Sequence, residues 1–139
     1  MNVGPTARGT FDARALDALA AYGQWMALHE HSIYGCGRAP AEFPVPQDCR
    51  LTYNPKSNRL YVHVFNWPFE RLHLDGFAGR VAYAQLLNDA SEVRITEPPP
   101  SAPMPDNSMN ERQAAGALTL HLPVRRPNVI VPVVELFLK

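Results

Sequence analysis

The chain has 139 residues, with 13 Lys plus Arg balancing 13 Asp plus Glu, and 46% of its residues are hydrophobic. This length fits one ordinary domain with its own core. Because the net charge is zero, we expect no long-range electrostatic attraction to nucleic acid or to an anionic membrane, and we predict neither partner. No apolar run approaches the ~20 residues of a membrane helix, and residues 1–5 lack the features of a secretory signal. We therefore expect a soluble chain without a signal peptide and assign no compartment.

The first regular element is predicted near the N-terminus. Small and apolar residues recur there at spacings of three and four: Leu16, Leu19, Gly23 and Met26. Several alanines raise the helix propensity. We predict an amphipathic helix from Asp12 to Glu30, with Gly9-Thr10 providing a turn and a cap before it. The proline-containing stretch that follows, 35–47, is expected to be a connector crossing the surface.

After Asp48 the hydrophobic period changes to two, which is typical of strands. We predict strands at 51–53, 60–66, 72–74, 80–87, 92–96, 117–122 and 129–138. Residues 54–58 are expected to form a hairpin turn, and the proline-rich segment 97–112 an exposed loop. Short strands with frequent turns favour a mainly β fold, an antiparallel β-sandwich preceded by one amphipathic α-helix.

Several motifs, in register over nearly the whole chain, resemble the C-terminal end of family 29 α-L-fucosidases. They are residues 2–6 (NVGPT), 22–26 (YGQWM), 32–35 (SIYG), 60–68 (LYVHVFNWP) and the ending from 120 to 136. Ser32 departs from the Glu or small residue that the family commonly has before the Ile. The resemblance implies that the helix is the remnant last helix of a (β/α)8 barrel. It divides the chain into a barrel-derived loop and helix (1–35), a connector (36–47) and a C-terminal β-sandwich domain (48–139).

The resemblance also implies what this chain lacks. Such a family resembles other retaining glycosidases, which use a carboxylate nucleophile and a carboxylic acid/base about 5–5.5 Å apart. Both would lie upstream, in a barrel of about 250 residues. The resemblance therefore implies a truncated, non-catalytic structural or ancillary part of a hydrolase that releases terminal α-L-fucosyl residues. We expect it to be inactive alone and assign it no catalytic residue.

Three residues are candidates for binding a sugar. Asn2 follows a strand on the catalytic face of the barrel that the resemblance implies. Tyr61 and Trp67, which share one face with Phe65 if the strand alternation continues, are candidates for an aromatic platform. The competing interpretations are a frayed terminus for Asn2 and inter-sheet core for the aromatic row.

Other chemistry finds no support in the sequence. His29 and His31 are two apart, so a helix would point them to different faces, unlike the i, i+4 pair of a zinc helix. We predict no metal and no cofactor. A rival function is a stand-alone carbohydrate-binding or oligomerisation module, which would bind fucosylated glycans without turnover. Because the helix lacks the barrel against which it would pack, we also expect a homo-oligomer formed through Asp12 to Glu30, or a helix folded onto the sandwich.

Overall fold

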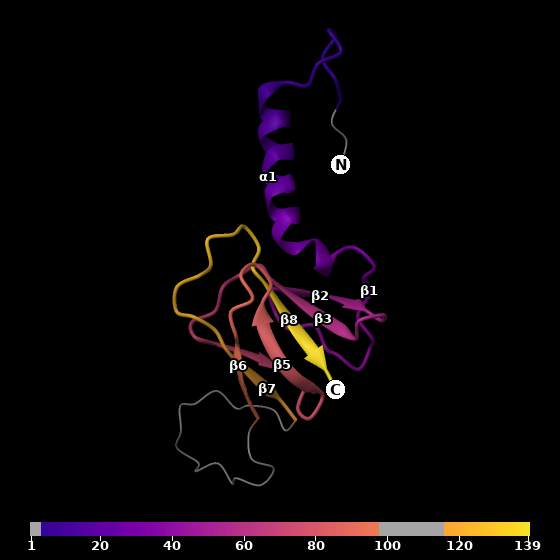
Figure 1. Cartoon of the computed structure of the whole chain (residues 1–139). Helices are drawn as coiled ribbons and strands as arrows, with labels where there is room; N and C mark the ends of the chain where they lie inside the picture. The colour runs from indigo at the N-terminus through magenta and orange to yellow at the C-terminus, as the bar shows by residue number, and fades with distance from the viewer. Residues whose placement is uncertain (1–3, 98–115) are drawn as a thin grey trace.

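The computed structural model describes residues 4–97 and 116–139, which form two packed antiparallel sheets with a helix standing on them (Figure 1). The five-stranded sheet has the order β1-β2-β3-β8-β5 and the three-stranded sheet the order β4-β7-β6. The helical elements are α1 (Ala13–His29) and the 3-10 turn η1 (Glu30–Ser32). The strands are β1 (Gly37–Arg38), β2 (Cys49–Asn54), β3 (Arg59–Val64), β4 (Arg71–Leu74), β5 (Val81–Leu86), β6 (Arg94–Thr96), β7 (Leu118–His121) and β8 (Val133–Leu138). The predicted fold class, a mainly β sandwich preceded by one helix, is confirmed.

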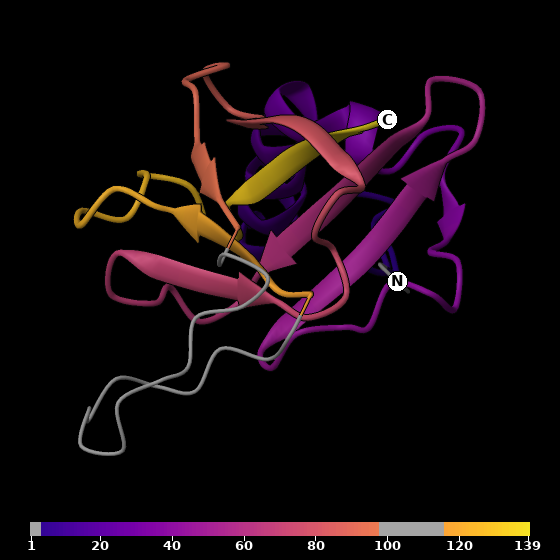
Figure 2. The same cartoon turned by 90° about the horizontal axis from the view of Figure 1, so that it is seen from below.

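The core lies between the two sheets, which Figure 2 shows from below with the helix behind them. Successive strand residues point to opposite faces, so alternate apolar residues of both sheets meet in the middle. In β3, Leu60, Val62 and Val64 face this core, and Val134 and Leu136 of the neighbouring β8 join them. Val134 and Leu136 are fully buried, and β8 lies between β3 and β5 in the larger sheet.

The hairpin between β2 and β3 confirms the predicted turn at 54–58. The side-chain oxygen Oδ1 of Asn54 accepts hydrogen bonds from the backbone N–H groups of Lys56 and Ser57, at 3.0 and 3.3 Å. Asn58 takes a left-handed backbone conformation with φ 52°, which Asn tolerates better than most residues. The turn thereby fixes the register in which Leu51 is paired with Val62.

The ends of α1 differ in one detail from the sequence prediction. Gly9 does form a turn, with φ 75°, but the cap is Asp12 rather than Thr10. The Asp12 carboxylate accepts a hydrogen bond from the backbone N–H of Ala15 at 2.8 Å. Both Asp and Thr are good N-caps, and the choice between them depends on where the extended backbone turns helical, which propensity alone does not fix.

Two strand boundaries also differ from the prediction. Residues 129–132, expected to begin the last strand, form a loop that ends at Pro132, because Pro has no backbone N–H to give to a ladder. The Arg126 guanidinium satisfies the carbonyls of Val129 and Ile130 there. The two-residue strand β1, paired with β2 through Gly37 and Tyr53, lies in the segment expected to be a connector. Nearly all of the predicted loop 97–112 lies outside the described residues.

Within the described ranges, no helix has both the length and the apolar character needed to cross a bilayer.

Replacing Leu136 with Ala should lower the free energy of unfolding by about 2–5 kcal/mol, because Leu136 is fully buried between the sheets. The matched control is Leu16→Ala on α1, where the side chain is 51% exposed and Ala is the better helix former, so the change should stay within about 0.5 kcal/mol. Urea unfolding followed by circular dichroism measures both. A loss at Leu16 as large as that at Leu136 would contradict the exposed position of this helix face.

Candidate functional site

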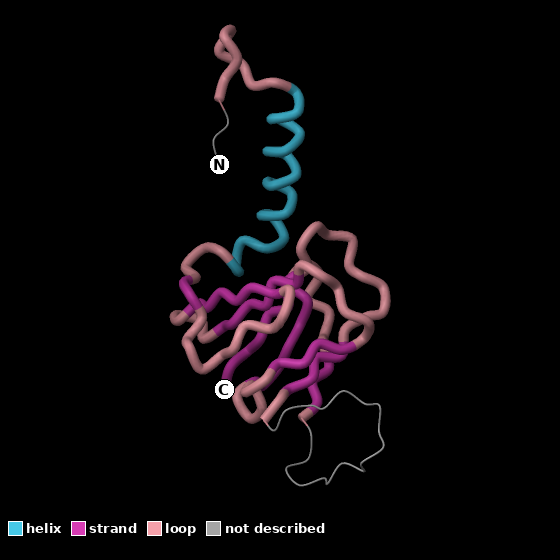
Figure 3. Tube along the Cα trace, turned by 180° about the vertical axis from the view of Figure 1, so that it is seen from behind, coloured by secondary structure: helices cyan, strands magenta, loops and turns pink. Residues whose placement is uncertain are grey.

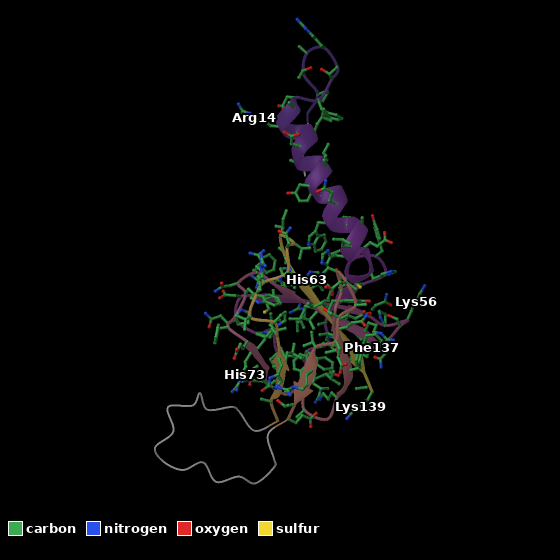
Figure 4. The ribbon with its side chains drawn as sticks, turned by 60° about the vertical axis from the view of Figure 1, so that its left-hand side comes forward. Arg14, Lys56, His63, His73, Phe137 and Lys139 are labelled. Carbon is green, nitrogen blue, oxygen red and sulfur yellow. The ribbon has the colours of Figure 1, made fainter. Side chains whose placement is uncertain are left out.

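The candidate site is the base of α1, where the helix meets the five-stranded sheet. Figures 1 and 3, taken from opposite sides, show the helix rising away from the sandwich, so that its last turns approach the strands and its first turns do not. The side chains that make this contact come from the end of α1, from β2 and β3, and from the loop 123–132 before β8. Figure 4 shows His63 below the helix at this junction.

Trp25 is the main contact between the helix and the sheet. Its indole Nε1–H donates a hydrogen bond to the backbone carbonyl of Val131 at 3.0 Å. One face of the indole stacks on His29, with ring centroids 4.6 Å apart and an interplanar angle of 11°. His63 of β3 lies farther away, with its centroid 6.2 Å from that of Trp25. The indole is therefore fixed both by a directional hydrogen bond and by stacked imidazoles.

A short hydrogen-bond chain fixes the proton position on His63. The Ser32 hydroxyl donates to the His29 carbonyl at 2.7 Å, and the Thr52 hydroxyl donates to the Ser32 carbonyl at 2.6 Å. Thr52 has then used its single proton, so its oxygen accepts at 3.0 Å from Nε2 of His63. This assigns the Nε2–H tautomer to His63, and the chain connects η1 to β2 and β3.

His29 has the opposite tautomer. Its Nδ1 lies 2.9 Å from the backbone carbonyl of Trp25, which can only accept, so Nδ1 carries the proton. Its Nε2 is buried and has no hydrogen-bond partner. One ring nitrogen of His29 is therefore satisfied by the protein, and the other is neither hydrogen-bonded nor solvated. A second proton on this ring would place an N–H in a buried position without an acceptor, which is costly.

Both imidazoles are held neutral by their surroundings. Burial, and then the neighbouring His29, lower the pKa of His63 to about 4. Burial also lowers the pKa of His29. The hydrogen bond to the Trp25 carbonyl raises this pKa, but by less than burial lowers it. Protonation of either ring would put a cation beside another imidazole under an indole, in a place with little water. The contact at the helix base is thus a contact between neutral rings.

Around this contact the surface is apolar and hollowed. A shallow groove of about 530 Å³ runs between the helix, β3 and the loop before β8. It is lined by Ala18, Ala21, Tyr22, Trp25, Met26, His63, Phe65, Ile130 and Val131. We call these residues the helix-base surface. Three of its large side chains are well exposed, Tyr22 at 57%, Phe65 at 57% and Ile130 at 66%. Such a contiguous apolar patch is typical of a surface that packs against something.

The structure places the predicted sugar-binding residues apart. Asn2 lies outside the described residues. Tyr61 is buried on the outer face of the five-stranded sheet, whereas Trp67 packs partly against the core and donates from Nε1 to the Pro123 carbonyl at 3.0 Å. Trp67 does not continue the row of Tyr61 and Phe65 as alternation suggested, because β3 ends at Val64 and the chain turns there. Their role in binding sugar stays a prediction.

Tyr61 belongs to a buried polar network around Glu135 of β8. The Tyr61 hydroxyl donates to Oε1 of Glu135 at 3.3 Å, and the Gln85 amide donates to Oε2 at 2.7 Å. The Arg59 guanidinium forms an ion pair with the same carboxylate at 3.7 Å. Burial, and then the charge of Glu135, raise the pKa of Tyr61 to about 12, so its hydroxyl remains a donor. Sequence reasoning missed this network, because it joins three strands that are distant in the chain.

In the part of the chain that the structure describes, no three His, Cys, Asp or Glu side chains gather in a way that would hold an ion. His29 is buried and His31 is exposed, which agrees with the expectation that helical positions two apart face different ways.

Comparison with solved structures decides the relationship. An α-L-fucosidase isoenzyme 1 from Paenibacillus thiaminolyticus is 34% identical, with a TM-score of 0.81 over 99% of this chain and 30% of that one. The chain is similar to the C-terminal part of α-L-fucosidases of glycoside hydrolase family 29. This fucosidase-like chain therefore spans less than a third of the length of the relatives it matches. No protein-family model and no curated protein sequence matches it.

Two more distant structures agree with the fucosidase-like fold. A family 29 α-L-fucosidase from Bacteroides thetaiotaomicron, trapped as a covalent intermediate, is 24% identical with a TM-score of 0.75, over 99% of this chain and 28% of that one. The Thermotoga maritima α-fucosidase is 18% identical with a TM-score of 0.70, over 97% and 29%. At these identities the likeness concerns the fold. It includes α1 as well as the sandwich, because it covers nearly the whole fucosidase-like chain.

Acidification should weaken the base of α1 through His63. The unfolded state takes up the proton near pH 6.5 and the folded state near pH 4, so between these values the unfolded chain binds more protons. The free energy of unfolding should consequently fall as the pH falls through this window, by on the order of 3 kcal/mol. Chemical unfolding at several pH values between 7 and 3.5 measures the change.

His63→Leu removes the larger titrating contribution, while Thr52 keeps its bond to the Ser32 carbonyl, so the dependence between pH 6.5 and 4 should become shallower, and His29 should retain part of it. His31→Gln is the control, because His31 is exposed and outside the Trp25 contact. If His31→Gln flattened the profile as much as His63→Leu, the assignment of the effect to the buried ring would be wrong.

Proposed function

We propose that this chain is a non-catalytic part of an α-L-fucosidase-like glycoside hydrolase, in which the helix-base surface packs against the rest of the enzyme. The observation that carries the proposal is the 34% identity to a fucosidase over 99% of this chain and 30% of the relative. The whole enzyme would hydrolyse terminal α-L-fucosyl residues by a retaining mechanism. A covalent intermediate, such as that of the Bacteroides thetaiotaomicron relative, is the species expected of such a mechanism.

The carboxylates support a non-catalytic role. A retaining glycosidase needs two carboxyl groups about 5–5.5 Å apart facing one sugar. Among the described residues Glu135 is the single buried acidic side chain, and its oxygens are already engaged by Tyr61, Gln85 and Arg59. A carboxylate so occupied is a structural group, and it has no buried acidic partner in residues 4–97 and 116–139.

The helix supports a role in packing. Leu16 and Tyr22 are 51% and 57% exposed, and Leu28 on another side of the helix is 45% exposed. Burying a large apolar side chain completely contributes roughly 1.5–3 kcal/mol relative to full exposure, and about half of this remains to be gained at these exposures. A helix in contact with the sandwich through its last turns alone presents its remaining apolar side chains to a partner. In the fucosidase relatives, the part of the enzyme that this chain does not cover is large enough to be that partner.

A hydrolysis assay tests the catalytic part of the proposal. The purified chain should release no chromophore from a chromogenic α-L-fucoside above a mock-purified blank, while the Paenibacillus thiaminolyticus enzyme serves as positive control. Exchanging the matching segment of that enzyme for this chain should give a folded enzyme with measurable turnover, because the helix-base surface then regains a partner. Turnover by the isolated chain would contradict the non-catalytic role, and an inactive, unfolded exchange product would contradict the packing role.

The same surface favours a second candidate function, an oligomerisation module. In isolation the chain should associate through α1, because a second helix-base surface is the most abundant apolar partner available. Analytical ultracentrifugation should show dimers or larger species that Tyr22→Glu disrupts by at least about tenfold in dissociation constant. Lys56→Glu, in the exposed hairpin turn away from α1, is the control and should change little. A monomer at high concentration would eliminate this function for the isolated chain.

A further inference from the structure

The outer face of the three-stranded sheet carries a row of basic side chains. The register pairs Arg71 of β4 with His121 of β7, and His121 with Arg94 of β6, so the three lie side by side across the sheet. Their chain neighbours Leu72, Leu120 and Ile95 point inward to the core, which leaves the row on the opposite face. With strands about 4.8 Å apart, the row spans roughly 10 Å between its two guanidinium-bearing strands.

His121 is positioned between the two arginines by hydrogen bonds. Its Nε2 lies 2.9 Å from the Thr96 hydroxyl, and its Nδ1 lies 3.5 Å from Nη2 of Arg94. Because a guanidinium can only donate, Nδ1 faces it as an acceptor, and the neutral ring carries its proton on Nε2. The ring is therefore oriented by β6 and exposes a face between Arg71 and Arg94.

The positive charge of this row is poorly compensated. In residues 4–97 and 116–139 the single ion pair joins Arg59 to Glu135, so neither Arg71 nor Arg94 has a described carboxylate in contact. Both arginines are exposed. The acidic side chain that acts on His121 is that of Glu70, at the start of β4, and it is opposed by Arg94, Arg71 and His73. Although the net charge of the chain is zero, the outer face of the three-stranded sheet has a local excess of positive charge.

An exposed aromatic ring lies at the same end of the sheet. Phe69 is 77% exposed, and its carbonyl accepts a hydrogen bond from the N–H of Arg71 at 2.7 Å. The backbone of Glu70 in turn accepts from Leu122, which follows His121, at 2.8 Å. An exposed aromatic side chain two residues before an exposed arginine suits a ligand with both an apolar ring face and a negative charge.

We propose that the row Arg71, His121 and Arg94, with Phe69 beside it, binds an anionic saccharide, one that carries sulfate esters or carboxylates. The two guanidinium groups hold the oxyanion with charge-assisted hydrogen bonds, His121 lies between them, and Phe69 stacks on the sugar ring. The site is on the sheet remote from α1 (Figure 1), so the proposal does not rest on the packing of the helix-base surface.

Binding is coupled to protonation of His121. Burial, followed by the charges of Arg94 and Arg71, lowers the pKa of His121 in the free chain, while Glu70 acts in the opposite direction and His73 in the same one. A bound oxyanion favours the protonated ring, so the affinity rises as the pH falls and His121 gains its proton. A ligand held by Phe69 alone would show no such rise.

Titration calorimetry with a sulfated dextran oligosaccharide and with unsulfated dextran of the same length tests the proposal. The sulfated form should bind and the unsulfated form should bind at least about tenfold more weakly. Arg71→Gln and Arg94→Gln should each lower the affinity roughly tenfold, the cost of one charge-assisted hydrogen bond. All substituted side chains are exposed, and thermal unfolding confirms that each variant folds.

Three controls make the result decisive. Arg14→Gln removes the same charge from the far end of α1 and should leave the affinity unchanged; an equal loss there would show unspecific attraction. Phe69→Ala should weaken the sulfated oligosaccharide but not inorganic sulfate, which separates the sugar contact from the anion contact. Equal binding of the two dextrans, tighter binding of polyglutamate than of sulfated dextran, or binding of neither dextran would overturn the proposal.

Discussion

The pairing of β8 between β3 and β5 is the interaction on which the rest of the fold depends. β8 joins the β2–β3 hairpin to β5, and without it the larger sheet would separate into two pieces. Its residues alternate between the two faces of the sheet. Val134 and Leu136 pack in the inter-sheet core, while Glu135 accepts hydrogen bonds from Tyr61 and Gln85 on the outer face. One strand thus connects the apolar interior with the buried polar network, and the base of α1 rests on the loop that leads into it.

The two faces of the molecule have different chemistry for the same structural reason. Each sheet uses one face for the shared core, so its other face is free to carry a specific set of side chains. On the larger sheet, Thr52 and His63 contact the end of the helical segment, and Glu135 is paired with side chains of the sheet itself. The smaller sheet carries exposed arginines around His121 that are available to a ligand. The two proposals of packing and of binding therefore concern different sheets.

Local sequence patterns predict most of the fold and little of the site. Period-two alternation, the turn at 54–58 and the alanine-rich helix are short-range signals, and they locate the strands, the hairpin and α1. β1 has two residues and no apolar pattern, so it forms because β2 offers an edge and not because of its own propensity. The stacking of Trp25 on His29 follows from helical spacing, but the approach of His63 depends on how the helix ends on the sheet. The row of Arg71, His121 and Arg94 depends on register between strands that are distant in the chain, which a single sequence does not reveal.

The position of β8 in the chain also determines when the sheet can close. Tyr61 of β3 pairs with Glu135 of β8, so the central ladder joins residues that are 74 positions apart. Ladders of such long range form slowly, because the chain entropy of closing the loop must be lost before the contacts are gained. Until β8 is in place, β3 and β5 each present an open edge to other chains. Kinetic competition between closing this sheet and intermolecular edge pairing is therefore built into the strand order, and it should grow with protein concentration during refolding.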